Sequence, residues 1–388
     1  MSKSAIMNTY GRKDVFFKTG KGSYLFDENG DKYLDFVMGI ATNTLGHCDE
    51  EMSKVIKEQA SSLIHLSNLY WNYPQTDLGQ KLIDKSDMGA VFFCNSGTES
   101  VEGALKLALK HGKTISGEKN KLICFNNSFH GRTLGSLKVT NEKYQKDYSV
   151  DSSNVIVVDY NDPKMLEEVF DKNVCGVILE PIQGEGGIIS STAEFMEKVR
   201  ELCDKYESLM ILDEVQCGMG RSGEYFAFQK YQVKPDVISL AKGLGGGIPI
   251  GAVLVSEKYK DVLKPGDHGS TFGGNPLSCS VALSVIKEID EKDLLNNVKS
   301  MSDYIIDSYE SLKEKYHLGE IKGEGLLLGF DPIIENKKVL DKLYEKKVLL
   351  VGAGNNVIRI LPPLNVEKNQ IDLLFEKLDE VFSEIDKC

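Results

Sequence analysis

The feature that most constrains this chain is Lys242, a lysine set among glycines in the segment Ser239-Leu-Ala-Lys-Gly-Leu-Gly-Gly-Gly-Ile-Pro-Ile-Gly251. The apolar run before it, 236–241, predicts a strand, so Lys242 is expected where a strand ends and a loop begins. A lysine that bonds covalently to an aldehyde cofactor needs a rigid base, a permissive backbone and neighbours that lower its pKa. A glycine-rich surface loop without any chemistry would look the same, so this segment alone leaves both interpretations open.

A second informative segment has an acid directly after a buried strand. Leu209–Leu212 is a run of apolar residues, and Asp213 follows it. Because ligands of open α/β sheets bind at the carboxyl ends of the strands, we expect Asp213 to meet a ligand. An anion in that place suits a pyridine ring, since it keeps the ring nitrogen protonated and lets the ring accept electrons. The alternative is an acid that only caps the following turn.

A third segment predicts a phosphate site. An apolar strand, 90–94, leads through Asn95 into a helix that covers Ser100–Lys110. Ser96 and Glu99 have the spacing of a capping box. The turn offers backbone amides and hydroxyls at the positive end of the helix, from Ser96, Gly97 and Thr98. An N-cap with no ligand would look identical. The segment lacks P-loop spacing, and no G-x-G-x-x-G run follows a strand elsewhere, so a dinucleotide-binding oxidoreductase is the weaker alternative.

Composition and charge set the broad class of the protein. The 388 residues are 41% hydrophobic and 27% charged, which is ordinary for a globular protein of two or three domains. The formal net charge of −12 disfavours nucleic-acid and anionic-membrane partners, so any phosphate or carboxylate site must be a local positive patch. No apolar run approaches the roughly 18 residues of a membrane span, and Met1–Ile6 lacks a signal-peptide core, so we expect a cytoplasmic protein.

The eight cysteines are scattered, without a C-x-x-C pair or paired histidines at ligand spacing, so we expect no metal site and mostly reduced thiols. Cys94, Cys124 and Cys175 lie in apolar runs, where cysteine behaves as a small hydrophobic residue. Cys217 is next to Gln216 but is assigned no chemical role.

Strand-like and helix-like stretches alternate along the middle of the chain, which predicts an α/β fold with a mostly parallel sheet covered by helices. The expected large domain covers residues 51–283. Residues 1–50 contain two short strands around Asn29-Gly30, a hairpin signal, and we expect them to join residues 284–388 in a smaller α+β domain. The expected strands of the large sheet include Lys121–Phe125, Val155–Val158, Val174–Leu179, Leu209–Leu212, Val237–Leu240 and Ala252–Val255.

These segments together resemble the class-III, ornithine-type aminotransferases of pyridoxal-phosphate fold type I. The resemblance runs nearly end to end, and within the family the segments around Tyr33–Cys48 are most similar to N-acetylornithine aminotransferases. In one place the chain departs from the family: where members commonly have His-Cys-His-Pro, it has His47-Cys-Asp-Glu50. The matching motifs include Asn95-Ser-Gly-Thr-Glu99, Phe129-His-Gly-Arg132-Thr, Glu180-Pro-Ile-Gln-Gly-Glu185-Gly-Gly, Asp213-Glu-Val-Gln216, Lys242-Gly, Gly269-Ser-Thr271-Phe-Gly-Gly-Asn-Pro276 and Ile358-Arg359-Ile-Leu-Pro-Pro363.

The resemblance implies a pyridoxal 5′-phosphate enzyme whose catalytic residue is Lys242, bonded to the cofactor and later moving a proton as general base and acid. It implies that Asp213 faces the pyridine nitrogen, that Phe129 stacks on the ring and that Gln216 donates to the phenolate oxygen of the ring. The phosphate group would be held by Ser96, Gly97 and Thr98 and, across a homodimer interface, by Thr271.

The resemblance also implies how substrates are recognised. Arg132 would clamp a substrate carboxylate through two hydrogen bonds. Glu185 would neutralise Arg359 while an ornithine-type donor binds, and would swing away so that Arg359 can bind the α-carboxylate of 2-oxoglutarate. A static ion pair is the alternative. His130 is left unassigned, and Glu180 is expected at most to shape its loop.

The implied reaction is a ping-pong transamination of N-acetylornithine with 2-oxoglutarate, which gives N-acetylglutamate 5-semialdehyde and glutamate in arginine biosynthesis. Ornithine, succinylornithine and 4-aminobutyrate are alternative donors, because one pocket contact changes selectivity by only about 1–3 kcal/mol. A catalytically silent binding protein of the same fold is a second alternative, disfavoured by the presence of both Lys242 and Asp213. The expected partners are therefore small molecules and a second copy of the chain, and neither nucleic acid nor a membrane.

Overall fold

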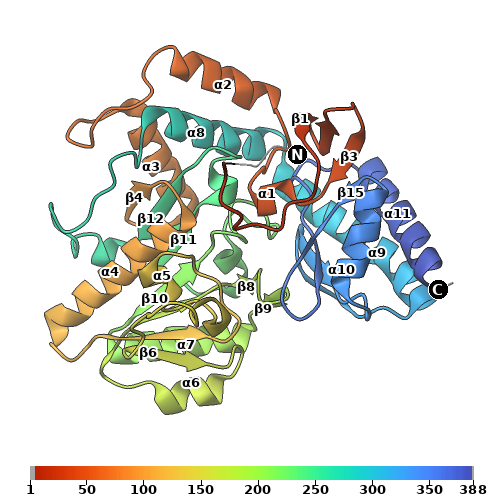
Figure 1. Ribbon diagram of the computed structural model, residues 1–388. Helices are drawn as coiled ribbons and strands as arrows, with labels where there is room; N and C mark the ends of the chain where they lie inside the picture. Colours follow the sequence, from red (N-terminus) through yellow and green to blue (C-terminus); the bar gives the residue numbers. More distant parts are fainter. Residues whose placement is uncertain (1–4, 387–388) are drawn as a thin grey trace.

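The computed structural model describes residues 5–386, and its larger lobe is built on a seven-stranded sheet (Figure 1). Strand β12 runs antiparallel to both of its neighbours, while the other neighbouring strands pair in parallel. This pairing confirms the expected mostly parallel α/β sheet. In spatial order the strands are β4 (Ala90–Cys94), β12 (Gly251–Val255), β11 (Val237–Leu240), β10 (Leu209–Asp213), β7 (Val174–Leu179), β5 (Lys121–Phe125) and β6 (Val155–Val158).

The helices of this lobe are α2 (Glu50–Ala60), α3 (Tyr73–Ser86), α4 (Gly97–Ile115), α5 (Leu134–Leu137), α6 (Pro163–Val169), α7 (Ala193–Tyr206) and α8 (Pro276–Glu291). Strand β10 is buried on both faces. Leu209 and Ile211 belong to one buried cluster with residues of α4, and Met210 and Leu212 belong to another with residues of α7. Because successive side chains of a strand point to opposite faces, helices on both faces account for the continuous apolar run in the sequence.

The departure from the family motif at His47–Glu50 forms the start of a helix. Asp49 is the N-cap of α2, and its carboxylate accepts a hydrogen bond from the Met52 N–H at 2.9 Å. An acidic N-cap is among the most favourable, worth about 1 kcal/mol. His47 keeps a separate contact, with 2.8 Å between its Nε2 atom and Asp35 Oδ2. The unusual Asp49 therefore stabilises the helix start without entering the site described below.

The smaller lobe joins the two ends of the chain. Its first sheet has the order β1 (Phe17–Lys21), β2 (Tyr24–Asp27), β3 (Lys32–Asp35) and β15 (Val348–Leu349), so a strand from the C-terminal third pairs with the N-terminal hairpin. The pairing of β2 with β3 confirms the hairpin expected around Asn29-Gly30. A second sheet has the order β13 (Ile321–Glu324), β14 (Leu327–Phe330), β17 (Ile358–Ile360) and β16 (Val351–Gly352).

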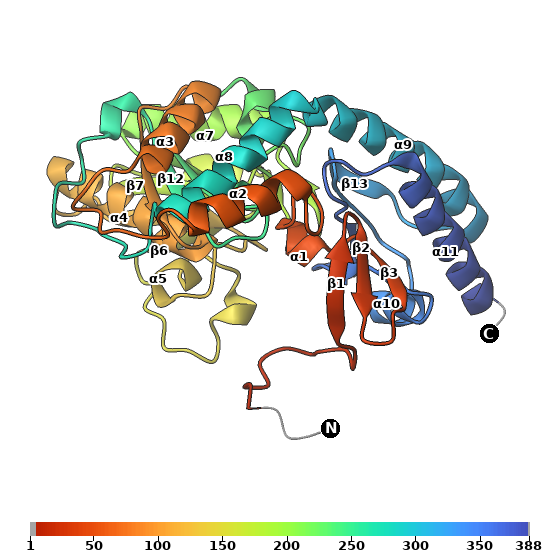
Figure 2. The same cartoon turned by 90° about the horizontal axis from the view of Figure 1, so that it is seen from above.

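The N-terminal strands lie beside the C-terminal helices in both views (Figures 1 and 2). These helices are α9 (Leu294–Tyr316), α10 (Asn336–Glu345) and α11 (Lys368–Asp386). Helices α8 and α9 are separate, because Asp293 adopts a positive φ of 50° between them. We propose that residues 1–50 and 284–388 form the small domain, although residue 283 falls inside α8 rather than in a linker.

Two further expectations concern the surface and the thiols. Within residues 5–386, the structure has no helix that is both long enough and apolar enough to cross a membrane. The seven cysteines in that range are free thiols, and all of them are buried except Cys48. Cys388 and Met1–Ser4 lie outside the described residues. Burial raises the pKa of the Cys94 and Cys124 thiols to about 12, so both remain protonated and act as small apolar side chains.

Candidate active site

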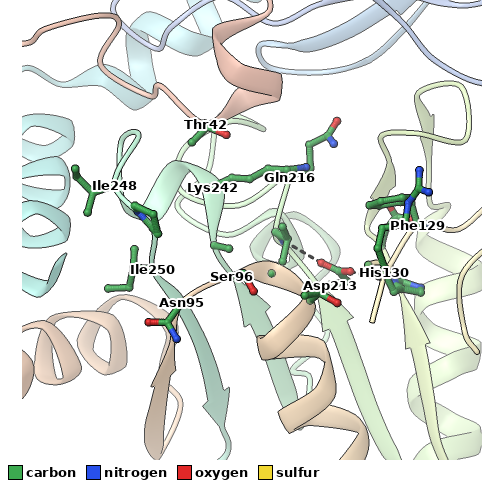
Figure 3. A pocket seen from close by; sticks show the side chains of 18 of the residues that line it. Thr42, Asn95, Ser96, Phe129, His130, Asp213, Gln216, Lys242, Ile248 and Ile250 are labelled. Carbon is green, nitrogen blue, oxygen red and sulfur yellow. Dashed lines mark hydrogen bonds and ion pairs between the residues drawn. The ribbon is translucent and has the colours of Figure 1, made fainter. Parts of the chain in front are cut away.

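A cavity of about 410 Å³ lies at the carboxyl ends of β4, β5, β7, β10 and β11 (Figure 3). Ligands of α/β sheets bind at this edge, and the volume is within the range of small-molecule sites. Residues of four separate sequence segments thus meet in one place. Of the residues singled out in the sequence, those that line the cavity are Ser96, Gly97, Thr98, Phe129, Arg132, Asp213, Gln216 and Lys242.

Lys242 follows β11 and extends toward Gln216 (Figure 3). Its amine has no hydrogen bond or ion pair with any other residue that the structure describes. Burial lowers the pKa of Lys242 from its ordinary value, so more of the amine is in the neutral, nucleophilic form. Gly243, directly after it, is buried rather than on the surface, and a Cβ atom there would lie 2.9 Å from Thr44 Oγ1.

Asp213 ends β10 and is 3% exposed. One carboxylate oxygen lies 2.7 Å from His130 Nδ1, and the other accepts a hydrogen bond from the Val215 N–H at 3.0 Å. The opposite ring nitrogen of His130 is buried and has no partner within residues 5–386. A buried carboxylate held from two sides keeps its place at the base of the cavity. Asp213 therefore accepts a hydrogen bond from the next turn and also lines the cavity.

The N-terminus of α4 forms one wall of the cavity. Ser96 is the N-cap, and its Oγ accepts a hydrogen bond from the Glu99 N–H at 3.3 Å, as the capping-box spacing predicted. The returning bond differs from the standard box, because Glu99 Oε2 accepts from the Asn95 N–H at 2.7 Å. Thr98 Oγ1 lies within hydrogen-bond distance of Ser136 Oγ, at 2.7 Å. Its backbone amide, and that of Gly97, remain at the positive end of the helix.

The backbone of Phe129 is bound by a buried acid, Glu180. The Phe129 N–H donates to Glu180 Oε2 at 3.1 Å, and the Gly184 N–H donates to Glu180 Oε1 at 3.4 Å. Burial, followed by the neighbouring Asp213, raises the pKa of Glu180 well above its ordinary value. Glu180 thus joins the segment of Phe129 to the hairpin that follows β7. It lines the cavity itself, which goes beyond the loop-shaping role expected from the sequence.

Glu185 and Arg359 form an ion pair beside the cavity, as the family resemblance implied. Arg359 is almost completely buried and also donates to Gln216 Oε1 at 3.2 Å and to the Gly352 carbonyl at 2.9 Å. Burial acts to raise the pKa of Glu185, but Arg359 outweighs it, so the pKa lies below its ordinary value. The Glu185 side chain is 22% exposed while Arg359 is 1% exposed, so the glutamate is the partner with room to move.

Thr271 does not lie in this cavity within one chain. It is exposed and lines a second, larger cavity of about 1190 Å³ together with Asn68, Tyr70 and Trp71. The loop that carries it is tied down, since Asn68 Nδ2 donates to the Ser270 carbonyl at 3.1 Å and to the Gly273 carbonyl at 2.9 Å. An ordered, exposed Thr271 apart from Lys242 agrees with a role at another subunit's site, which remains a proposal.

The profile of the family described as Aminotransferase class-III matches residues 6–382. The chain belongs to the class-III aminotransferases. Two of the relatives most similar to this aminotransferase are both acetylornithine aminotransferases. The one from Clostridium acetobutylicum is 48% identical over 96% of this chain and 97% of its own length. The one from Methanocaldococcus jannaschii is 43% identical over 100% of this chain and 98% of its own length.

Solved structures agree with the assignment to this aminotransferase family. The ornithine aminotransferase from Toxoplasma gondii ME49 is similar with a TM-score of 0.92 and 30% identity, covering 99% of this chain and 93% of that one. The N-acetylornithine aminotransferase from Stenotrophomonas maltophilia K279a is similar with a TM-score of 0.85 and 32% identity, covering 97% of this chain and 98% of that one. This likeness confirms the fold that the resemblance implied.

Class-III aminotransferases depend on pyridoxal 5′-phosphate, and the cavity of this aminotransferase fits that cofactor. Lys242 offers an amine without a partner for the aldehyde, and the buried Asp213 offers an anion for the pyridine nitrogen. Gly97 keeps the start of α4 close to the β10 end, because a Cβ atom there would lie 2.7 Å from Val215 Cγ1. The amides of this helix start would hold the phosphate group.

Two residues of this site were missed in the sequence. His130 stands next to Phe129 in a quoted motif, but its contact with Asp213 joins residues that are far apart in the chain. Glu180 precedes a proline, which drew attention to loop shape rather than to its carboxylate. The available signal was their position at the same sheet edge as Asp213: Glu180 directly follows β7, and His130 lies in the loop after β5.

Proposed function

We propose that this aminotransferase transfers the side-chain amino group of N-acetylornithine to 2-oxoglutarate, giving N-acetylglutamate 5-semialdehyde and glutamate, a step of arginine biosynthesis. The observation that carries the proposal is the Glu185–Arg359 ion pair beside the Lys242 cavity. The same site must bind a donor with one carboxylate and an acceptor with two. It therefore needs an arginine whose charge is neutralised while the donor is bound and available while the acceptor is bound. The relatives named acetylornithine aminotransferase support this choice of donor.

When bound, pyridoxal phosphate takes up an amino group and stabilises the electron pair left on the carbon that loses a proton. Lys242 would hold the cofactor through its side-chain amine. When it is not bonded to the cofactor, its Nζ atom would act as general base toward the proton on the amine-bearing carbon of the donor, and then as general acid that gives the proton back. Asp213 would face the pyridine nitrogen, and His130 Nδ1, which lies 2.7 Å from Asp213 Oδ2, holds that carboxylate in place.

Substrate carboxylates would be shared between two arginines. Arg132 lines the cavity and would bind the carboxylate of N-acetylornithine. With 2-oxoglutarate, Glu185 would turn away so that Arg359 binds the α-carboxylate, leaving Arg132 for the distal one. The Glu185 backbone would stay in place during this motion, since the Gly354 N–H donates to its carbonyl at 2.9 Å. Only the side chain has to move.

A panel of amine donors assayed against 2-oxoglutarate tests the proposed substrate. We expect the highest kcat/KM for N-acetylornithine, with succinylornithine, ornithine and 4-aminobutyrate below it. Glutamate formation measured at equal donor concentrations ranks the four. A higher kcat/KM for ornithine or 4-aminobutyrate would replace the proposed donor while leaving the transamination itself intact.

Removing the Glu185 carboxylate should change the preference of the enzyme between glutamate and N-acetylornithine. In Glu185→Ala, Arg359 loses its ion-pair partner and remains open to α-carboxylates at all times. The ratio of kcat/KM for glutamate to that for N-acetylornithine should therefore rise about tenfold, the change produced by roughly 1.4 kcal/mol of altered binding. Half-reaction kinetics with each donor measure this ratio. Equal effects on both donors would instead mean that the ion pair is static.

We further propose that the enzyme is a homodimer with shared active sites. The surface around the second cavity exposes apolar side chains that a monomer in water would be expected to cover, among them Leu69 (83% exposed) and Trp71 (86% exposed). Such patches mark protein interfaces. Because Thr271 lines the same cavity, a partner covering the patch would bring its own site close to this threonine.

A mixed dimer tests the sharing. One subunit carries Lys242→Ala and the other Thr271→Glu, whose added charge should repel the phosphate group. If Thr271 serves the partner's site, one site of the mixed dimer combines both lesions and the other is intact, so about half of the activity per dimer should return. If Thr271 serves its own subunit, each site keeps one lesion. A mixture that stays inactive after verified subunit exchange would reject the shared site.

A further inference from the structure

Tyr144 lies against Arg132 at the edge of the cavity that Lys242 lines. The centre of the Arg132 guanidinium group is 4.1 Å from the centroid of the Tyr144 ring and 5.4 Å from the centroid of the Phe129 ring. The two rings meet edge to face, with 5.5 Å between their centroids and 83° between their planes. The guanidinium group is therefore supported by two aromatic rings that are themselves packed together.

This aromatic contact takes the place of an ion pair. Among residues 5–386, Arg132 has no carboxylate partner and no hydrogen bond, whereas Arg359 is covered by Glu185. A ring attracts the cation through its face but leaves the N–H groups in the guanidinium plane unused. Arg132 is thus held without being neutralised. Its donors stay available for an incoming carboxylate.

The position of Tyr144 is set by the backbone around it. Tyr144 ends a 3₁₀ turn, Glu142–Tyr144, and its N–H donates to the Asn141 carbonyl at 3.0 Å. The Asn141 N–H in turn donates to the Ser128 carbonyl at 2.9 Å, one residue before Phe129. Thr140 Oγ1 accepts from the His130 N–H at 2.9 Å. The segment of Tyr144 is therefore tied to the segment that carries Phe129 and Arg132.

We propose that Tyr144 is a positioning residue that orients the Arg132 guanidinium group for the α-carboxylate of the amine donor. The proposal rests on the role given to Arg132 under the proposed function. Among the amine donors, only those that present this carboxylate should depend on Tyr144, because its ring touches Arg132 and Phe129 rather than lining the cavity where the amine reacts.

Two matched donors separate this role from a general structural one. N-acetylputrescine is N-acetylornithine without the α-carboxylate, so it keeps the reacting amine and the acetamide. For Tyr144→Leu, we expect kcat/KM for N-acetylornithine to fall roughly fivefold to tenfold, mainly through KM, while kcat/KM for N-acetylputrescine stays within about twofold of wild type. Binding of the unreactive analogue N-acetylnorvaline, measured by calorimetry, should weaken by a similar factor. An equal fall for both donors, or no fall for either, would overturn the proposal.

Control variants keep the result interpretable. Tyr144→Phe retains the ring and should restore most of the lost affinity, whereas Lys143→Ala removes a cation 4.8 Å from the same ring and should change neither donor. Tyr144→Met replaces Tyr144→Leu if the latter does not fold. Arg132→Gln must lose N-acetylornithine selectively. If it does and Tyr144→Leu does not, the inference about Tyr144 is wrong. If Arg132→Gln slows both donors equally, the proposed role of Arg132 is wrong.

Discussion

Replacing Lys242 by alanine should abolish turnover while leaving a folded protein. The side chain makes no hydrogen bond or ion pair with another residue in the described part of the chain, so its loss removes chemistry rather than packing. General acid–base catalysis alone contributes roughly 10²–10⁴-fold, and Lys242 also provides the covalent attachment, so kcat should fall by at least about 10⁴-fold. Steady-state assays with N-acetylornithine and 2-oxoglutarate measure the loss.

Borohydride treatment checks the same assignment without turnover. In the wild-type holoenzyme, reduction should fix the cofactor to one peptide that contains Lys242. In Lys242→Ala the cofactor should remain removable by dialysis, and Lys242→Arg should behave the same way because a guanidinium group keeps the charge without forming the bond. Cofactor fixed to any other lysine in the wild type would make the assignment of Lys242 wrong.

Asp213→Asn should slow both half-reactions together by about three orders of magnitude, the scale of losing a preorganised charge in a water-excluded site. The amide oxygen of the asparagine can still accept the hydrogen bond of Val215, and its NH2 group can donate to His130 Nδ1 when that ring carries its proton on Nε2, so both contacts of the β10 end are kept while the charge is removed. Rapid mixing with N-acetylornithine, and separately with 2-oxoglutarate, measures each half-reaction. Near-normal rates would return Asp213 to the role of a turn residue.

The neighbouring Glu214 is a matched control for Asp213. It is equally buried, but its carboxyl accepts the Ala227 and Phe228 N–H groups at 2.7 and 2.8 Å and does not line the cavity. Burial raises the pKa of Glu214 to about 8, so this side chain is mostly uncharged at pH 7. Glu214→Gln removes one of these two acceptors, so it should lower the stability of the protein while leaving the rates of both half-reactions per folded active site close to wild type. A loss as large as that of Asp213→Asn would mean that any change at this strand end disturbs the site.

Local patterns in the sequence were sufficient to locate the strand ends of the site. A buried parallel strand is a continuous apolar run, and the first polar residue after it lies at the ligand-binding edge, as with Asp213 and Lys242. A capping residue such as Ser96 likewise marks a helix start from its immediate neighbours. These features depend on spacing along the chain, so they could be predicted without knowing the tertiary structure.

Contacts between distant segments could not be predicted in the same way. The 2.7 Å contact of His130 with Asp213, the bridge that Glu180 makes between Phe129 and Gly184, and the ring of Tyr144 under Arg132 depend on how loops from different strands meet. Neither the composition of the chain nor the periodicity of its apolar residues predicts which loops come into contact. The pairing of β15 with the N-terminal hairpin has the same origin, since a two-residue strand leaves no pattern of its own.

The proposed function requires that the holoenzyme retains the amino group of N-acetylornithine on its cofactor and then transfers it to 2-oxoglutarate. A half-reaction with N-acetylornithine labelled with ¹⁵N on the side-chain amine tests it most directly. Holoenzyme mixed with this donor alone, freed of small molecules and then given 2-oxoglutarate should yield ¹⁵N-glutamate in an amount equal to the active sites. Glutamate without the label, or no aldehyde product before 2-oxoglutarate is added, would contradict the account.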